Sequence, residues 1–228
     1  MISDPRCQIL PIALVDEGAK VMGDAFANTP AFNYIFQGDI KYRRKALKWM
    51  FKQNLTLVTK QCPSAFRGIL DDEGNIAACF LWTLSSQAHI STSSKYSMLK
   101  AGMWQIPFRF GLATLLRLFE VMDDLHAAED FFQTGGSNAP QEFIRLKRVA
   151  VSPNYQRMGL GSKMLKSAIA ETKCPMFLST HEYSSVKFYE RLGYRVVGEI
   201  ELSQDCKEHT FSGWFMTQEP ATTGASIV

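Results

Sequence analysis

The sequence predicts an α/β or α+β fold built on a mixed sheet. Segments with apolar residues at helical spacing alternate with short apolar runs that are bounded by turn residues. The clearest turn is Asp71-Asp-Glu-Gly-Asn75, which separates two apolar runs and predicts an antiparallel hairpin. In the second half of the chain, strand-like and helical segments follow one another in turn. Such alternation is typical of a sheet that has helices packed on its faces.

The first half is expected to hold two helices and three strands. Asp16 is the expected N-cap of the first helix, and Thr29-Pro30 is expected to end it. Apolar residues recur on one side of a second helix at 41–60. The expected strands are 7–14, 65–70 and 76–84.

A helical insertion of about 85–141 is expected next, between the third and fourth strands. We then expect strands at 143–151, 176–180 and 195–202, helices at 159–172 and 184–192, and a strand at 211–216 that pairs with its predecessor. Residues 1–218 are interpreted as one domain, and 219–228 as a flexible tail.

Bulk composition excludes several classes of protein. The formal net charge is +3 and the charges are dispersed, which argues against a nucleic-acid partner. Five cysteines without a Cys-x-x-Cys pair indicate reduced thiols in the cytoplasm, with no metal site. The apolar stretch 101–119 contains Pro107, Arg109 and Arg117, so we expect no membrane span.

The most informative segment is 145–163, a strand that runs through a turn into a helix. Pro153 ends the strand, and Gly159 and Gly161 permit a tight approach before the helix. Backbone N–H groups at a helix start have no partner inside the helix and attract anions. The amides expected to form this anion site are those of Gln156, Arg157, Met158, Gly159, Leu160, Gly161 and Ser162.

This segment resembles the acyl-CoA-binding motif of the GNAT N-acetyltransferase superfamily, Val-x-Pro-x-x-Gln/Arg-x-x-Gly-x-Gly/Ala. Val151, Pro153, Gln156, Gly159 and Gly161 fall in register with it. The resemblance implies acetyl-CoA as cosubstrate, and a mixed, mostly antiparallel central sheet flanked by helices. It also implies that backbone amides of the fourth strand, at Val149, Ala150 and Val151, contact the thioester oxygen.

A second block is similar to the family's last helix, which ends in Tyr-Glu-x-Leu-Gly-Phe/Tyr. The matching residues are Tyr189, Glu190, Leu192, Gly193 and Tyr194. The sequence of residues 188–193 resembles that of the puromycin-acetyltransferase-like branch of the family. Many members carry an asparagine at the start of this helix, where Ser184 and Ser185 stand here. One of these serines is therefore the expected polar contact to the cofactor.

The resemblance implies that Tyr189 protonates the departing thiolate, because a phenol is a donor with a pKa of about 10. The alternative is a packing tyrosine at a helix end. Two residues compete as general base: Glu142, at the start of the fourth strand, and His181, at the end of a later strand. Glu142 is alternatively a solvated carboxylate, and His181 a structural residue.

The acceptor is expected to be a small-molecule primary amine, bound by a monomer or homodimer. An acidic cluster of Asp123, Asp124, Glu129 and Asp130 favours a cationic amine, unless it is a solvated helix face. A catalytically inactive CoA-binding regulatory module, an O-acceptor and a longer acyl chain are the alternatives. Several aromatic residues are candidates to line the acceptor cleft, and the alternative is that they belong to the core. They are Phe32, Tyr34, Phe36, Trp82, Trp104, Phe108, Phe131 and Phe132.

Overall fold

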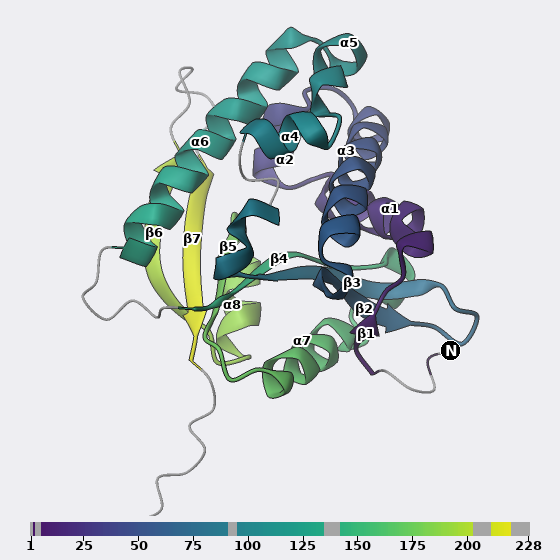
Figure 1. Cartoon of the computed structure of the whole chain (residues 1–228), viewed down its shortest axis with the longest axis vertical. Coiled ribbons are helices and arrows are strands. Elements are labelled where there is room, and N and C mark those ends of the chain that lie inside the picture. Colours follow the sequence, from purple (N-terminus) through teal and green to yellow (C-terminus); the bar gives the residue numbers. More distant parts are fainter. Residues whose placement is uncertain (1, 3–5, 91–94, 135–141, 203–210, 220–228) are drawn as a thin grey trace, which may run out of the picture.

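The computed structural model describes residues 2, 6–90, 95–134, 142–202 and 211–219. Along the chain, helices lie between strands of one sheet (Figure 1). The helices are α1 (Val15–Phe26), α2 (Pro30–Ile35), α3 (Ile40–Gln61), α4 (Lys95–Lys100), α5 (Ile106–Phe110), α6 (Leu112–Thr134), α7 (Leu160–Glu171) and α8 (Tyr183–Glu190). The strands are β1 (Gln8–Ile9), β2 (Phe66–Leu70), β3 (Ile76–Leu84), β4 (Ile144–Val151), β5 (Met176–Thr180), β6 (Arg195–Leu202) and β7 (Phe211–Gln218).

The described strands form one seven-stranded sheet in the order β1-β2-β3-β4-β5-β7-β6. Within it, β4 and β5 are parallel and the other neighbours are antiparallel. The expected mixed, mostly antiparallel sheet is confirmed, as is the helical insertion, since α4, α5 and α6 lie between β3 and β4.

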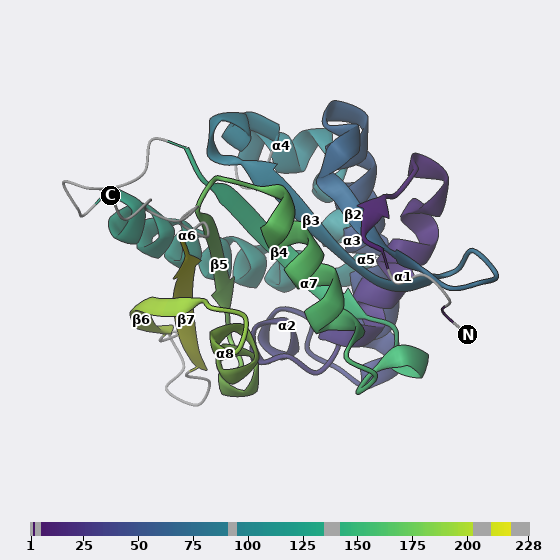
Figure 2. The ribbon, with the colours of Figure 1, turned by 90° about the horizontal axis from the view of Figure 1, so that it is seen from below.

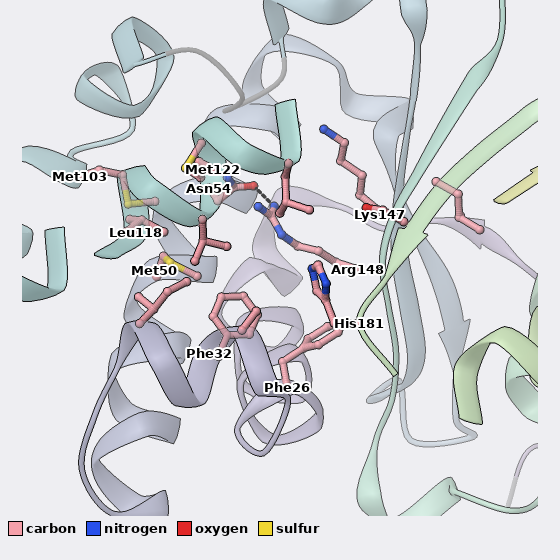
Figure 3. Close-up of a pocket in the computed structure, with 16 residues that line it drawn as sticks. Phe26, Phe32, Met50, Asn54, Met103, Leu118, Met122, Lys147, Arg148 and His181 are labelled. Carbon is pink, nitrogen blue, oxygen red and sulfur yellow. Dashed lines mark hydrogen bonds between the residues drawn. The ribbon is translucent and has the colours of Figure 1, made fainter. Parts of the chain in front are cut away.

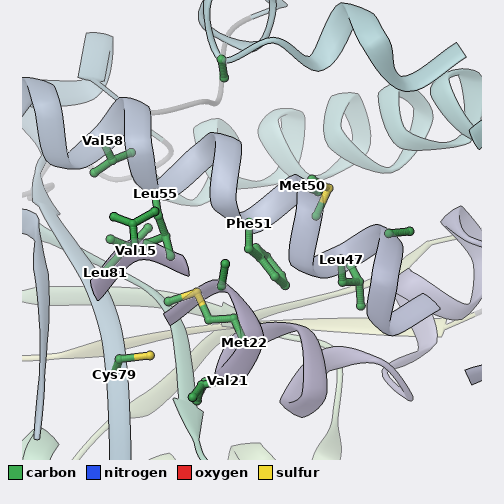
Figure 4. Packing of buried hydrophobic residues seen from close by; sticks show 14 of the residues in the cluster. Val15, Val21, Met22, Leu47, Met50, Phe51, Leu55, Val58, Cys79 and Leu81 are labelled. Carbon is green, nitrogen blue, oxygen red and sulfur yellow. The ribbon is translucent and has the colours of Figure 1, made fainter. Parts of the chain in front are cut away.

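Helices cover both faces of the sheet (Figures 1 and 2). In Figure 2, α7 lies in front of β3 and β4, while α1 and α3 lie behind the sheet. Figure 4 shows how α3 packs down on α1 and β3, with Phe51 and Leu55 directed at Met22 and the strand residue Leu81. These four side chains are at most 3% exposed, so this layer holds the larger core. A second core lies between the sheet, α7 and α8.

Two expectations for the first 40 residues were wrong, and one helix was missed. The strand expected at 7–14 is only Gln8–Ile9, because Pro11 breaks it and a 3₁₀ turn follows. Asp16 lies inside the first turn of α1 and pairs with Lys52 at 2.8 Å, so it is not the N-cap. The first helix ends before Thr29-Pro30, as expected, but Pro30 also opens the missed helix α2, at a first position where the missing N–H costs nothing.

The long apolar segment 101–119 is also divided. Gly111, at φ +90°, separates α5 from α6. No helix in the described ranges is long and apolar enough to cross a membrane. The expected flexible tail, 219–228, lies outside the described residues except for Glu219.

Candidate active site

Strands β4 and β5 separate in the middle of the sheet. They pair at two positions, Ile144 with Met176 and Arg145 with Phe177. Beyond Phe177, β5 stays paired with β7 as far as Thr180, while β4 stays paired with β3 as far as Val151. Main-chain groups on the facing edges of the two strands are therefore not used by the sheet ladder beyond this point.

A bulge in β4 lies at this separation. The β3–β4 register shifts between the pairs Cys79–Ala150 and Leu81–Lys147, so β4 gains one residue on β3. Arg148 takes φ +57°, an uncommon value for a residue other than glycine. After the bulge, the Ser152 N–H donates to β3 at Ala77 O (2.9 Å). Because N–H directions alternate along a strand, the amides of Val149 and Val151 point to the side from which β5 has departed.

The segment after β4 presents its backbone at the start of α7. Arg157 and Gly159 both have positive φ, +64° and +73°, which turns the chain into the helix. The first bond inside α7 runs from the Lys163 N–H to Gly159 O, so the amides of Leu160, Gly161 and Ser162 precede it. Gln156, Arg157, Met158 and Gly159 are exposed around these amides. A helix start with a neighbouring exposed guanidinium can bind a phosphate group.

Gly161, not Gly159, is the glycine that is enclosed by protein atoms. A Cβ on Gly161 would lie 3.4 Å from Val151 Cγ2 and 3.5 Å from the Phe188 ring, so α7, β4 and α8 meet here. A Cβ on Gly159 would meet no protein atom within 4 Å. Of the two glycines expected to permit a tight approach, Gly161 is therefore the one that protein atoms enclose, while Gly159 is favoured by its positive φ.

Helix α8 lies on the same side of the sheet as α7. Tyr189 is buried, with its ring 5.1 Å from that of Phe188 and 5.6 Å from that of Tyr194. Burial raises the pKa of the Tyr189 phenol above its ordinary value, so it is protonated at neutral pH. Ser184 is exposed and Ser185 half-buried in the first turn of α8.

A cavity of about 240 Å³ opens on the other face of the sheet, below α2, α3 and α6. Its floor is β4 at the bulge, together with Ser179 and His181 at the end of β5. Figure 3 shows Phe26, Phe32 and methionine side chains facing Arg148 and His181 across it. The apolar lining residues are Phe26, Ala31, Phe32, Ile35, Met50, Met103, Leu118, Val121, Met122, Leu125 and Leu146.

His181 is the buried titratable group at the floor of the cavity. Burial lowers its pKa to about 4, partly opposed by a hydrogen bond to the backbone of Ser212. The ring packs edge-on against Phe211 at 5.3 Å. Its Nδ1 atom is buried and makes no hydrogen bond among the described residues. The imidazole is therefore neutral at pH 7 and can accept a proton.

The geometry does not support Glu142 as a base. Its carboxylate is exposed and accepts a hydrogen bond from Ser86 at 2.7 Å. It precedes Arg148 by six residues of extended chain, a separation of about 20 Å. Glu142 also takes no part in lining the cavity. Of the two candidate bases, only His181 lies where an acceptor could bind.

Most of the expected acceptor-site residues lie elsewhere. Phe32 lines the cavity, whereas Phe36 is core, Trp82 lies under Arg67, and Trp104 and Phe108 are exposed. The side chains of Phe131, Phe132, Asp124, Glu129 and Asp130 lie outside the described part. Asp123, the one described side chain of the expected acidic cluster, is exposed and does not line the cavity.

Sequence reasoning missed Arg148 and Asn54, which meet across the cavity. The Arg148 guanidinium on β4 donates a hydrogen bond to Asn54 Oδ1 on α3 and lies 5.3 Å from the Phe51 ring (Figure 3). A single sequence gives no signal for the bulge that directs Arg148 inward. Among the described residues, no group of three or more His, Cys, Asp or Glu side chains is arranged to hold a metal ion.

Comparison with known proteins agrees with this architecture. Residues 123–196 match the family model described as an acetyltransferase (GNAT) domain. A structure described as a histone acetyltransferase and related acetyltransferase from Corynebacterium glutamicum is 19% identical, covers 96% of this chain and 98% of its own, and has a TM-score of 0.58. Arylalkylamine N-acetyltransferase 2 of Aedes aegypti is 12% identical over 94% of this chain and 98% of its own, with a TM-score of 0.59.

A polyamine N-acetyltransferase of Drosophila melanogaster is 10% identical, covers 93% of this chain and 98% of its own, and has a TM-score of 0.58. Identities this low establish a shared fold and do not transfer a substrate. The chain thus has the GNAT fold, and its strand separation lies between a helix-start anion site on one face and an apolar cavity on the other.

Proposed function

We propose that this chain is an acyl-CoA-dependent N-acyltransferase that transfers an acetyl group from acetyl-CoA to a primary amine. The observation that carries the proposal is the separation of β4 from β5 beside the start of α7. Strand amides, helix-start amides and an apolar cavity lie around this region of the sheet. The GNAT domain match over residues 123–196 supports the same chemistry.

In this proposal, the start of α7 holds the pyrophosphate of the cosubstrate. The amides of Gln156, Arg157, Met158, Gly159, Leu160, Gly161 and Ser162 surround it, and the Arg157 guanidinium adds positive charge. The open space beside Gly159 fits an anion, because a Cβ there would meet no protein atom. Ser184 or Ser185 supplies a further polar contact from α8. The bound cosubstrate contributes the acetyl thioester.

The amine attacks directly in a ternary complex. A bond forms between the acceptor nitrogen and the acetyl carbon, and the carbon–sulfur bond breaks. The nitrogen loses one proton, for which neutral His181 is the acceptor, and the sulfur gains one from Tyr189. Amides of the Val149, Ala150 and Val151 stretch donate to the carbonyl oxygen as it gains charge. The position of Arg148 between these groups makes the bulge part of the site.

The rival function is a CoA-binding regulatory module without transfer. The acceptor cavity favours an enzyme, because a cofactor sensor has no need of a second binding cavity on the opposite face. An O-acceptor and a longer acyl chain remain the alternative chemistries within the enzyme class. Placement in the puromycin-acetyltransferase-like branch is proposed from the sequence motif at 188–193 alone. Location in the cytoplasm is proposed from the cysteine pattern.

The test begins with melting temperature in the presence of acetyl-CoA, longer acyl-CoAs, CoA and ATP, since a ligand that binds the folded state raises it. We expect a rise with acetyl-CoA and CoA but not with ATP. An amine screen with detection of free thiol then separates enzyme from sensor. Binding without thiol release for any amine or alcohol would favour the regulatory module, and the absence of binding would refute both.

A further inference from the structure

The described residues that line the cavity include no aspartate or glutamate. They include the cation Arg148 and His181 at its floor, and the other polar members of this described lining are Lys147, Asn54 and Ser179. The described lining is therefore mostly apolar, with the positive charge of Arg148 at the floor.

The Arg148 guanidinium is a cation of the cavity that lacks a negatively charged partner among the described residues. The side chain of Arg148 is partly buried, and burial lowers its pKa to about 10, which still leaves it charged at pH 7. Its contacts are the amide oxygen of Asn54 and the face of Phe51, and neither carries a negative charge. Among the described residues, no carboxylate lies within ion-pair distance of it. Buried charges in proteins are normally paired, because removal from water is costly.

A guanidinium has five N–H donors arranged to match a carboxylate. Asn54 takes one of the Arg148 donors and thereby fixes the direction of the guanidinium. The bulge holds the residue in place from the backbone side, at φ +57°. Arg148 is thus fixed in advance to receive an anion that no described residue supplies.

The walls define the rest of the ligand. Phe32, Met50 and Met122 face the charged floor and would contact an apolar body. The volume of about 240 Å³ lies below the ~300–1,000 Å³ of sites for drug-sized ligands. A molecule of the size of one amino acid fits this space.

Building on the proposed transfer to an amine, we propose that the acceptor is a free amino acid with an apolar side chain. Arg148 binds its carboxylate, Phe32, Met50 and Met122 contact its side chain, and its α-amine receives the acetyl group. The nitrogen–carbon bond forms as the carbon–sulfur bond breaks, and the products are an N-acetyl amino acid and CoA. This acceptor replaces the cationic amine that the acidic cluster favoured.

A carboxylate could also enter on the acyl donor, as in succinyl-CoA. We assign it to the acceptor because the cavity lies below α2, α3 and α6, on the face of the sheet opposite to α7. The two sources predict different substrate preferences, so kinetics separate them.

The experiment compares matched acceptors with and without a carboxylate: phenylalanine against phenethylamine, and leucine against isopentylamine. With acetyl-CoA, we expect kcat/KM for the amino acid to exceed that for the amine by about 100-fold, as a charge-assisted bidentate contact provides. In Arg148→Met this ratio should fall below about threefold. Arg44→Met is the control, because it removes an exposed arginine of α3, which pairs with Asp24 outside the cavity.

Arg148→Lys keeps the positive charge but loses the paired N–H donors of the guanidinium, so it should retain part of the preference for the amino acid. This variant also serves as a second test if Arg148→Met fails to fold. A preference for the amines in the unmodified protein would overturn the proposal. So would an Arg148-dependent preference for succinyl-CoA over acetyl-CoA, which would move the carboxylate to the donor.

Binding without turnover separates this inference from the proposed function. N-acetylphenylalanine should raise the melting temperature in the absence of acetyl-CoA, and N-phenethylacetamide should raise it less. Arg148→Met should abolish the difference, and Arg44→Met should retain it. If N-acetylphenylalanine raises the melting temperature more than N-phenethylacetamide does, but the protein acetylates no amine, the transfer reaction is refuted and the carboxylate site stands. If the two ligands raise the melting temperature equally and the protein acetylates other amines, the carboxylate site is refuted and the transfer reaction stands.

Discussion

The hydroxyl of Tyr155 donates a 2.7 Å hydrogen bond to the carboxylate of Asp71. This bond ties the segment after β4, which leads to the start of α7, to the turn between β2 and β3. Desolvation opposes ionisation of Asp71, but hydrogen bonds from Tyr155 and Asn75 outweigh it and lower its pKa to about 2. The carboxylate therefore stays ionised, and the contact remains, down to pH values well below neutrality.

Tyr155→Phe removes only this bond, so we expect acetyl-CoA affinity to fall by about threefold to tenfold while the fold is retained. The physical reason is that the segment before α7 loses the contact that holds it in the binding conformation. Calorimetric titration measures the change. An unchanged dissociation constant would show that the segment is held by the Pro153 turn and α7 alone.

Gly159→Ala places a Cβ at φ +73°, which costs about 1 kcal/mol of folding free energy. We also expect about tenfold weaker acetyl-CoA binding, because the methyl group enters the space assigned to the pyrophosphate. Gly74→Ala is a matched control: Gly74 has φ +85° and open surroundings but lies in the β2–β3 turn. Equal affinity losses in the two variants would indicate a general effect of strain and contradict the assigned anion site.

Tyr189→Phe should lower kcat by about 100-fold with little change in acetyl-CoA affinity, because the ring remains and only the proton donor is lost. Tyr194→Phe is the control, since this neighbouring phenol donates to Met176 Sδ at 3.5 Å and is not placed near the reaction. Single-turnover kinetics and calorimetry measure the two quantities. Full activity in Tyr189→Phe would assign the proton to water instead.

The burial of His181 makes stability depend on pH. Its pKa is about 4 in the folded protein against 6.5 for the free side chain. As the pH falls from about 6.5 to about 4, the unfolded chain binds a proton that the folded protein does not, so the folded state is progressively disfavoured. Between pH 7 and pH 5 this costs about 2 kcal/mol. His181→Gln should reduce the pH-dependent loss by that amount.

Urea unfolding at the two pH values measures this difference. An identical loss in the unmodified protein and in His181→Gln would show that the pKa of His181 is the same in the folded and unfolded states, and would contradict its lowering by burial.

The sequence was informative wherever local geometry decides the structure. Proline cannot donate to a sheet ladder, so Pro153 marked the end of β4, and the glycines marked the turn before α7. Failures came where one local signal allows two outcomes. Pro30 can end one helix or open the next, and the chain uses it to open α2. Glu142 was expected as a base from its position at a strand end, but its exposed carboxylate does not line the cavity.

The sequence by itself determined the class of fold and identified the segment proposed as the anion site, because both depend on neighbours along the chain: apolar periodicity, turn residues and an exposed helix start. Only the tertiary structure decided the acceptor cavity. Asn54, Arg148 and His181 come from α3, β4 and the end of β5, and they meet because one extra residue in β4 directs Arg148 toward α3. A bulge is selected by the packing of neighbouring strands and helices, and such packing leaves no periodic pattern in a single sequence.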